Sequence, residues 1–172
     1  IAIEPTKFLI ADAFGGSLAI LDAATAEIVS QHQIQGHHIG GLCYDEPSRT
    51  VLVTHQRLNK IAESSYPDIH WGTLMQNLVS QVPIQSLLEP TGDISALARL
   101  YRLGNTGKGA ADPAGIVSWS NGQFAVAVSG GNEIAFGKLG TNDLQFVSVG
   151  AKPTKMFKLG ENQLLCINDL DD

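Results

Sequence analysis

The residues best suited to chemistry are four histidines and one tryptophan, namely His37, His38, His55, His70 and Trp71. The first two lie at an expected joint between repeats, the third ends an apolar strand-like run, and the fourth opens the segment after it. Imidazole binds divalent metals and titrates near neutral pH, so such a cluster could hold a metal or face a haem in a partner. The alternative is a set of hydrogen-bonded surface or edge histidines. The chain has no His-Glu-x-x-His motif that would strengthen the metal hypothesis.

The two tryptophans have different expected roles. Trp119 lies in a strand-like run, where an indole typically packs between layers of the fold. Trp71 stands at an expected helix start and could form the wall of an interface or of a ligand site. The alternative for Trp71 is that it packs the surrounding segment onto the sheets.

A glycine-rich loop and an acidic end are the other candidate sites. Residues 104–109, GNTGKG, resemble a phosphate-binding loop, but a Walker loop needs Ser or Thr after the lysine, whereas Gly109 follows Lys108. The pattern therefore favours a flexible connection. The carboxylates of residues 169–172 could bind a cation, but the sequence favours an acidic turn whose side chains bond to the backbone.

The composition and motifs of the chain argue against several classes of partner and cofactor. The formal net charge is −6 and basic residues do not cluster, which argues against nucleic acid and against an anionic membrane surface. No apolar run reaches 18 residues, so no transmembrane segment is expected.

Cys43 and Cys166 each sit in an apolar run and are predicted to be buried thiols rather than a disulfide. The chain has no Cys-x-x-Cys-His motif, so no c-type haem is expected within it.

Short apolar runs between glycine-rich turns predict an all-β fold. Only 16% of the residues are charged and 18 are glycine, which suits a turn-dense β protein. The runs predicted as strands are residues 8–11, 18–21, 27–34, 39–44, 51–55, 124–128, 134–136 and 144–149. The clearest unit extends from Pro113 to Pro153, a period of 40 residues that is typical of one propeller blade. The sequence therefore predicts β-propeller blades, each a four-stranded antiparallel meander, in an incomplete ring that is the open part of a longer protein.

Residues 60–112 break this period. They are predicted to form a partly helical insertion between blades, within one partial propeller domain that spans residues 1–172. Apolar spacing predicts helices at residues 68–82 and 93–103, with Gly104 ending the second. Insertions on one face of a repeat fold often carry its function.

The joint before the last unit resembles the repeats of YVTN-type seven-bladed propellers. Units of that family end in Val-Gly-x-x-Pro, and residues 149–153 here read Val-Gly-Ala-Lys-Pro, with Ile-Asn-Asp following at 167–169. The resemblance covers roughly residues 7–56 and 113–172, and the first blade departs from it because Ile39 replaces the joint proline. The His-Trp-Gly of the insertion and the Ala-Asp-Pro-Ala-Gly return look most like propellers associated with c-type cytochrome or di-haem peroxidase-like proteins.

The resemblance implies a periplasmic or extracellular propeller that binds or scaffolds a protein partner through its insertion. The chain is expected not to be catalytic on its own, and no catalytic residue is assigned. The alternative is the propeller portion of a c-type cytochrome or peroxidase-like oxidoreductase involved in electron transfer. Its haem would sit in a partner or downstream domain, with His55, His70 and Trp71 at the contact. A third hypothesis is a lactonase- or hydrolase-like propeller with a metal in its channel.

Overall fold

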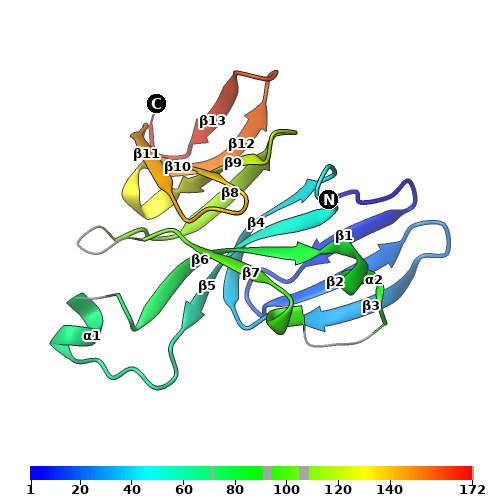
Figure 1. The fold of residues 1–172 in the computed structure, drawn as a ribbon, viewed down its shortest axis with the longest axis horizontal. Helices are drawn as coiled ribbons and strands as arrows, with labels where there is room; N and C mark the ends of the chain where they lie inside the picture. The colour runs from blue at the N-terminus through cyan, green and yellow to red at the C-terminus, as the bar shows by residue number, and fades with distance from the viewer. Residues whose placement is uncertain (71, 91–93, 105–108, 172) are drawn as a thin grey trace.

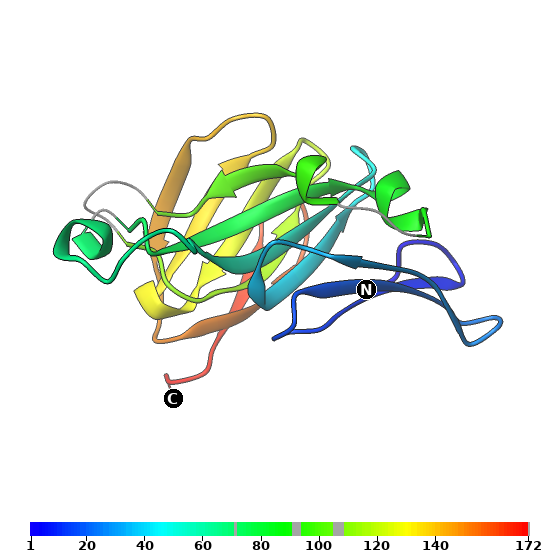
Figure 2. The same ribbon diagram turned by 90° about the horizontal axis from the view of Figure 1, so that it is seen from below.

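The computed structural model of the protein is a series of antiparallel sheets that follow one another along the chain (Figure 1). The structure describes residues 1–70, 72–90, 94–104 and 109–171. Figure 2 shows the same sheets from below, packed beside one another as propeller blades are, in an arc that does not close. The predicted all-β, propeller-type fold with an incomplete ring is therefore confirmed.

Each blade is a meander in which strands that are neighbours in sequence pair antiparallel. Blade 1 contains β1 (Lys7–Ala11), β2 (Ser17–Asp22) and β3 (Glu27–Gln33). Blade 2 contains β4 (His37–Asp45), β5 (Thr50–Leu58), β6 (Met75–Pro83) and β7 (Arg99–Arg102). Blade 3 contains β8 (Pro113–Ser118), β9 (Gln123–Val128), β10 (Glu133–Lys138) and β11 (Leu144–Ser148). Blade 4 contains β12 (Pro153–Lys158) and β13 (Leu164–Asn168).

Glycines let the first strands of successive blades lie against one another. A Cβ atom added at Gly40 of β4 would lie 2.1 Å from the carbonyl oxygen of Pro113 in β8. One added at Gly115 of β8 would lie 2.7 Å from the carbonyl oxygen of Thr154 in β12. Both approaches are closer than side-chain carbon atoms can make, so the blades can pack at this distance only because these residues have no side chain.

The strand β6 corrects the helix that was predicted for residues 68–82. Among the described residues of that range, only those of α1 (Tyr66–His70) are helical, and β6 pairs with β5 along its whole length. The prediction was wrong because Leu74, Leu78 and Val82 are four residues apart. That spacing fits one face of a helix, but four is also a multiple of the two-residue period of a strand.

The strand β7 corrects the helix that was predicted for residues 93–103. A single 3₁₀ turn, η1 (Ile94–Ala96), precedes β7, and the expected start of the helix at Asp93 lies outside the described residues. Gly104 accordingly follows a strand and does not cap a helix. The segment 60–112 is therefore not only an insertion between blades, because it supplies the two outer strands of blade 2.

The connection between β6 and β7 fastens blade 1 to blade 2. It contains α2 (Ile84–Leu88), and the buried side chains of Leu87 and Ile94 share one apolar core with Leu18 of β2. The hydroxyl of Ser30 in β3 donates a hydrogen bond of 2.6 Å to the carbonyl oxygen of Leu87. The helices in the described ranges are short, and none has the length and apolar character needed to cross a membrane.

Candidate functional site

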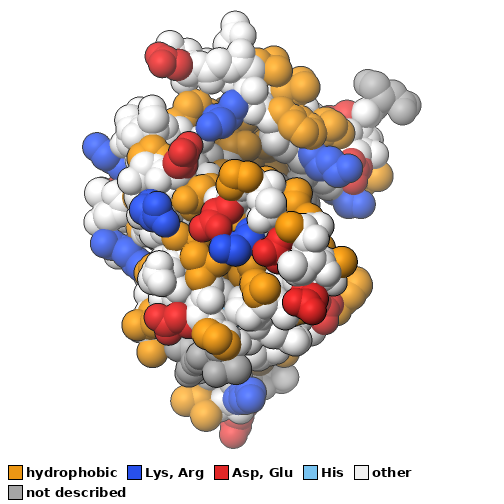
Figure 3. Space-filling model, turned by 90° about the vertical axis from the view of Figure 1, so that its right-hand side faces the viewer, with side chains coloured by type: hydrophobic (Ala, Val, Ile, Leu, Met, Phe, Trp, Pro, Cys, Tyr) orange, Lys and Arg blue, Asp and Glu red, His pale blue; other side chains and the backbone are white. Residues whose placement is uncertain are grey.

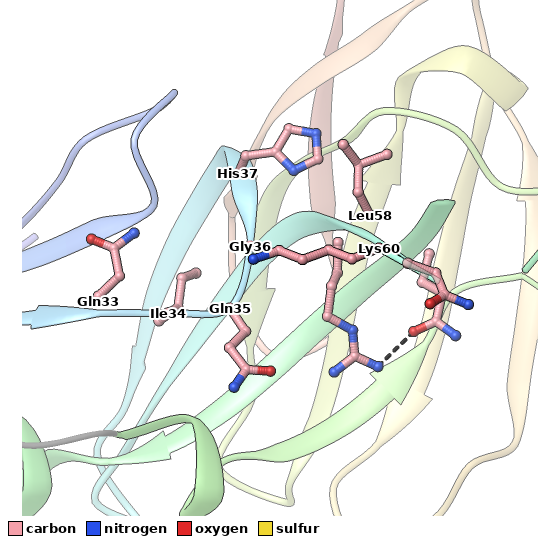
Figure 4. Close-up of a pocket in the computed structure, with 10 residues that line it drawn as sticks. Gln33, Ile34, Gln35, Gly36, His37, Leu58 and Lys60 are labelled. Atoms are coloured by element: carbon pink, nitrogen blue, oxygen red, sulfur yellow. Dashed lines mark hydrogen bonds between the residues drawn. The ribbon is translucent and has the colours of Figure 1, made fainter. Parts of the chain in front are cut away.

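A pocket of about 790 Å³ opens where the link from blade 1 to blade 2 meets the end of β5 (Figure 4). Residues 33–37 of the link form one wall, and residues 57–60 with Gln76 of β6 form the other. These segments meet because the first residue of β4, His37, pairs with Gln56 near the end of β5. The volume is in the range of sites that hold a small organic molecule.

Positively charged groups and amides dominate the polar lining of this pocket. The polar side chains that line it are His37, Arg57, Lys60, Gln33, Gln35, Asn59 and Gln76, and the described lining contains no Asp or Glu. Nη2 of Arg57 donates a hydrogen bond of 2.6 Å to Oε1 of Gln76, the dashed line in Figure 4. In the same view the Lys60 side chain reaches from its loop toward Gly36. The arrangement is suited to an anionic ligand.

His55 is buried directly beneath the link. Its Nε2 lies 2.7 Å from the hydroxyl of Ser80 and its Nδ1 lies 3.3 Å from the carbonyl oxygen of Gln56. A Cβ atom at Gly36 would lie 2.2 Å from Nδ1, so only glycine lets the link pass over the ring. Burial lowers the pKa of His55, and the positive charge of Arg57 acts in the same direction. Both ring nitrogens are thus occupied, and the ring supports the pocket from below.

The predicted histidines are not gathered into one cluster. His37 lines the pocket, whereas His38 is exposed with a φ of 51° in an irregular part of β4. His70 is exposed at the end of α1, and Trp71 lies outside the described residues. Within the ranges that the structure describes, no group of three or more His, Cys, Asp or Glu could hold a metal ion.

The two cysteines and Trp119 pack against apolar cores of the chain. Cys43 and Cys166 are free thiols, but both are half-buried and not buried as predicted. Burial raises the pKa of the Cys166 thiol. Trp119 is half-buried and packs on a core that joins blade 3 to Met156 of blade 4, which confirms its predicted packing between blades.

The acidic end of the chain forms the turn that the sequence favours. Oδ2 of Asp171 accepts a hydrogen bond of 2.5 Å from the backbone N–H of Ala151. Oδ1 of Asp169 accepts one of 2.8 Å from the hydroxyl of Thr154. Lys108 of the glycine-rich loop and the terminal Asp172 lie outside the described residues.

The loop of residues 59–74, between β5 and β6, projects beyond the sheets and carries α1 (Figures 1 and 2). Five large hydrophobic side chains on this loop and at its two ends are exposed, and we refer to them as the apolar loop patch. They are Leu58, Ile61, Tyr66, Ile69 and Met75. Ile61 is 90% exposed and Tyr66 77%, so neither contributes to the core of the chain.

Hydrogen bonds connect the described residues of the loop. The carboxylate of Asp68 accepts hydrogen bonds from the hydroxyls of Thr73, at 2.6 Å, and Ser65, at 2.9 Å. These bonds, that of Thr73 first, lower the pKa of Asp68. The backbone N–H of Asn59 donates to the carbonyl oxygen of Leu74 at 3.0 Å and closes the base of the loop. The apolar side chains are therefore carried by a loop whose described residues bond to one another.

Sequence reasoning missed the two principal cations of the pocket, Arg57 and Lys60. A signal was present, because the run Gln-Arg-Leu-Asn-Lys at 56–60 follows a predicted strand and the run Gln-Ile-Gln-Gly-His at 33–37 precedes another. Both runs are rich in hydrogen-bonding side chains. Only the pairing of β4 with β5 shows that they face the same space.

No family model matches the chain, and no curated protein matches it. The solved structures that resemble it include hydrazine synthase of Kuenenia stuttgartiensis, with a TM-score of 0.64 and 14% identity over 91% of this chain and 52% of that one. The β-propeller domain of Myceliophteria thermophila Cps50 (Swd1) has a TM-score of 0.54 and 14% identity over 94% of this chain and 44% of that one. Streptogramin B lyase has a TM-score of 0.56 and 10% identity over 99% of this chain and 51% of that one. The chain spans about half the length of these structures, and identities this low show the β-propeller fold alone.

Proposed function

We propose that this chain is a β-propeller binding module that docks a protein partner through the apolar loop patch. The observation that carries the proposal is the exposure of Ile61, Tyr66 and Ile69 on a loop that its own hydrogen bonds keep ordered. Several large hydrophobic side chains exposed on one projecting element are typical of an interaction surface. An ordered loop also loses little conformational entropy on binding, which strengthens association.

The surroundings of the patch indicate what kind of partner fits it. Arg57 and Lys60 flank Leu58 at one end of the loop and form no ion pair within the described residues. A partner with an apolar hollow bordered by carboxylates would complement both the patch and these cations. The proposal also places the module outside the cytoplasm, as the resemblance to extracytoplasmic propellers implies.

Truncation of Tyr66 tests the docking surface. A central aromatic side chain at an interface typically contributes about 1–2 kcal/mol, which corresponds to a roughly 5- to 30-fold rise in Kd for Tyr66→Ala. A protein captured by the wild-type chain from its native cells would be purified and its Kd measured by calorimetry. Leu97→Ser is the matched control, because Leu97 is 58% exposed but lies outside the patch. Equal Kd values for Tyr66→Ala and the wild type would overturn the proposal, as would the absence of direct binding.

A c-type cytochrome or di-haem peroxidase-like partner is a second candidate. The rings of Tyr66 and His70 stack on exposed α1, with centroids 5.5 Å apart and planes inclined by 14°. A flat ring pair at the tip of a projecting loop is suited to close contact with the edge of a haem, which in this proposal belongs to a partner or a further domain. The visible spectrum of the captured partner tests this candidate. A partner without haem absorbance excludes it, and a haem partner whose Kd is raised by His70→Ala but not by His38→Ala supports it.

A further inference from the structure

The pocket between residues 33–37 and 57–60 is positively charged, although the formal net charge of the chain is −6. Arg57 and Lys60 line it together with His37. Neither Arg57 nor Lys60 forms an ion pair with any residue in the described ranges, and the hydrogen-bond partner of Arg57 is the neutral amide of Gln76. On the side of the molecule drawn in Figure 3, by contrast, acidic and basic side chains are intermingled. The pocket is thus a local concentration of uncompensated positive charge.

Arg57 is held ready to bind an anion. It is half-buried on β5, and its bond to Gln76 on the adjacent strand fixes the guanidinium before any ligand arrives. A guanidinium carries five N–H donors, so the bond to Gln76 leaves several for a carboxylate or a phosphate. Lys60 is exposed on the loop and reaches toward the opposite wall (Figure 4), where its charge attracts the same group.

The amides of the pocket supply neutral hydrogen-bonding groups beside these cations. Nε2 of Gln33 is already used by the carbonyl oxygen of Gly15, at 2.5 Å. The side chain of Gln35 has no hydrogen bond to any described residue, and the amide nitrogen of Gln76 has none either. Free amide groups of this kind bond the hydroxyl groups of a ligand as donors and acceptors.

We propose that this pocket binds a hydroxylated organic anion, the class to which uronic acids and sugar phosphates belong. Arg57 and Lys60 bind its carboxylate or phosphate, and the amides of Gln35 and Gln76 bind its hydroxyl groups. The pocket shares Leu58 with the apolar loop patch, and its cations Arg57 and Lys60 are those that flank the patch. Its ligand is a small molecule, so this activity goes beyond the proposed docking of a protein and can be tested without a protein partner.

Calorimetric titration of the purified chain with four probes tests the ligand class. The probes are glucuronate, glucose 6-phosphate, uncharged glucose and inorganic phosphate. We expect glucuronate or glucose 6-phosphate to bind at least tenfold more tightly than glucose and than inorganic phosphate, and a preference between the two acids identifies the anionic group. If glucose or inorganic phosphate bound as tightly as the tighter of the two acids, the proposal would be overturned. The absence of binding by all four probes would overturn it as well.

Two variants locate the binding to the pocket. Arg57→Gln removes a charge-assisted hydrogen bond, and we expect it to raise the Kd of the more tightly bound acid about tenfold or more. Lys60→Gln changes an exposed loop residue with little risk to folding, and it should weaken the same ligand severalfold. Lys158→Gln on β12 removes an equal charge from an exposed strand far from the pocket in sequence and should leave binding unchanged. If both pocket variants bind the acid as the wild type does, the ligand site is elsewhere and the proposal fails.

Discussion

His55 is a titratable residue that the fold has almost completely removed from water. It is 2% exposed, and both ring nitrogens face neutral oxygens of Ser80 and Gln56. Because burial penalises the charged imidazolium, the pKa of His55 lies below its ordinary value of 6.5. The neutral ring allows the link at Gly36 to pass over it and so shapes the floor beside the pocket.

The lowered pKa of His55 predicts a pH dependence of stability. As the pH falls below 6.5, the unfolded chain takes up a proton at His55 more readily than the folded chain does. The contribution of His55 to the free energy of unfolding is therefore complete above pH 6.5 and declines below it. We expect His55→Gln to lose less stability than the wild type between pH 7.5 and pH 5.5, measured by urea unfolding. The exposed His38→Gln should keep the wild-type dependence, and a His55→Gln protein with that same dependence would contradict the interpretation.

The first strands of blades 2, 3 and 4 approach one another through backbone atoms rather than side chains. Gly40 faces Pro113 and Gly115 faces Thr154. A hydrogen bond of 2.7 Å from the hydroxyl of Thr54 to the carbonyl oxygen of Ala114 adds a polar contact between blades 2 and 3. The spacing of blades 2, 3 and 4 depends on these contacts.

A methyl group at Gly40 is expected to force blades 2 and 3 apart. Overpacking of this kind typically destabilises a protein by about 1–3 kcal/mol, and a rigid backbone oxygen at the contact puts Gly40→Ala at the upper end of that range. Gly109→Ala is the control, since no atom of a described residue lies within 4 Å of a Cβ atom placed there and the φ angle is ordinary. Urea denaturation should show a lower unfolding midpoint for Gly40→Ala alone. Equal unfolding midpoints for the two variants would show that blades 2 and 3 can move apart at this contact without loss of stability.

The arc of blades leaves the outer face of each terminal blade without a neighbour. On blade 1, Phe8 and Ile10 of β1 are 38% and 45% exposed. On blade 4, Phe157 and Leu165 are 48% and 46% exposed. The opposite face of blade 1 is buried against blade 2, where Leu9 of β1 shares a core with Val51 and Val53. Both ends of the molecule therefore expose apolar sheet surface of a kind that proteins normally cover.

These exposed faces predict concentration-dependent association of the isolated chain. Removing apolar surface from water favours contact between terminal blades of different molecules. Sedimentation velocity across a range of concentrations should show species larger than the monomer. The double variant Phe157→Lys/Leu165→Lys should shift the distribution toward monomer, whereas Leu97→Lys should not. A wild-type chain that stays monomeric at all concentrations would show that these faces do not associate.

The strands of blade 1 and the last three strands of blade 3 could be predicted to within two residues at each end because their signals are local. Alternating or continuous apolar runs, with Gly, Asn or Asp turns between them, are enough to predict β2, β9 and β10. The outer strands of blade 2 could not be predicted in this way. β6 is buried on both faces from Leu78 to Ser80, so its apolar residues do not alternate, and β7 has only four residues.

The sequence by itself determined that the chain is all-β, that it repeats with the period of a propeller blade, and that residues 60–112 carry its most distinctive part. These conclusions rest on interactions between residues close in the chain, which composition and spacing record directly. The tertiary structure alone decided that Arg57 and Lys60 share a pocket with His37, that His55 is buried and that His70 lies apart on a projecting loop. The reason is physical: these placements depend on the register of β4 against β5 and on the closeness of neighbouring blades, and both are set by contacts between residues far apart in the sequence.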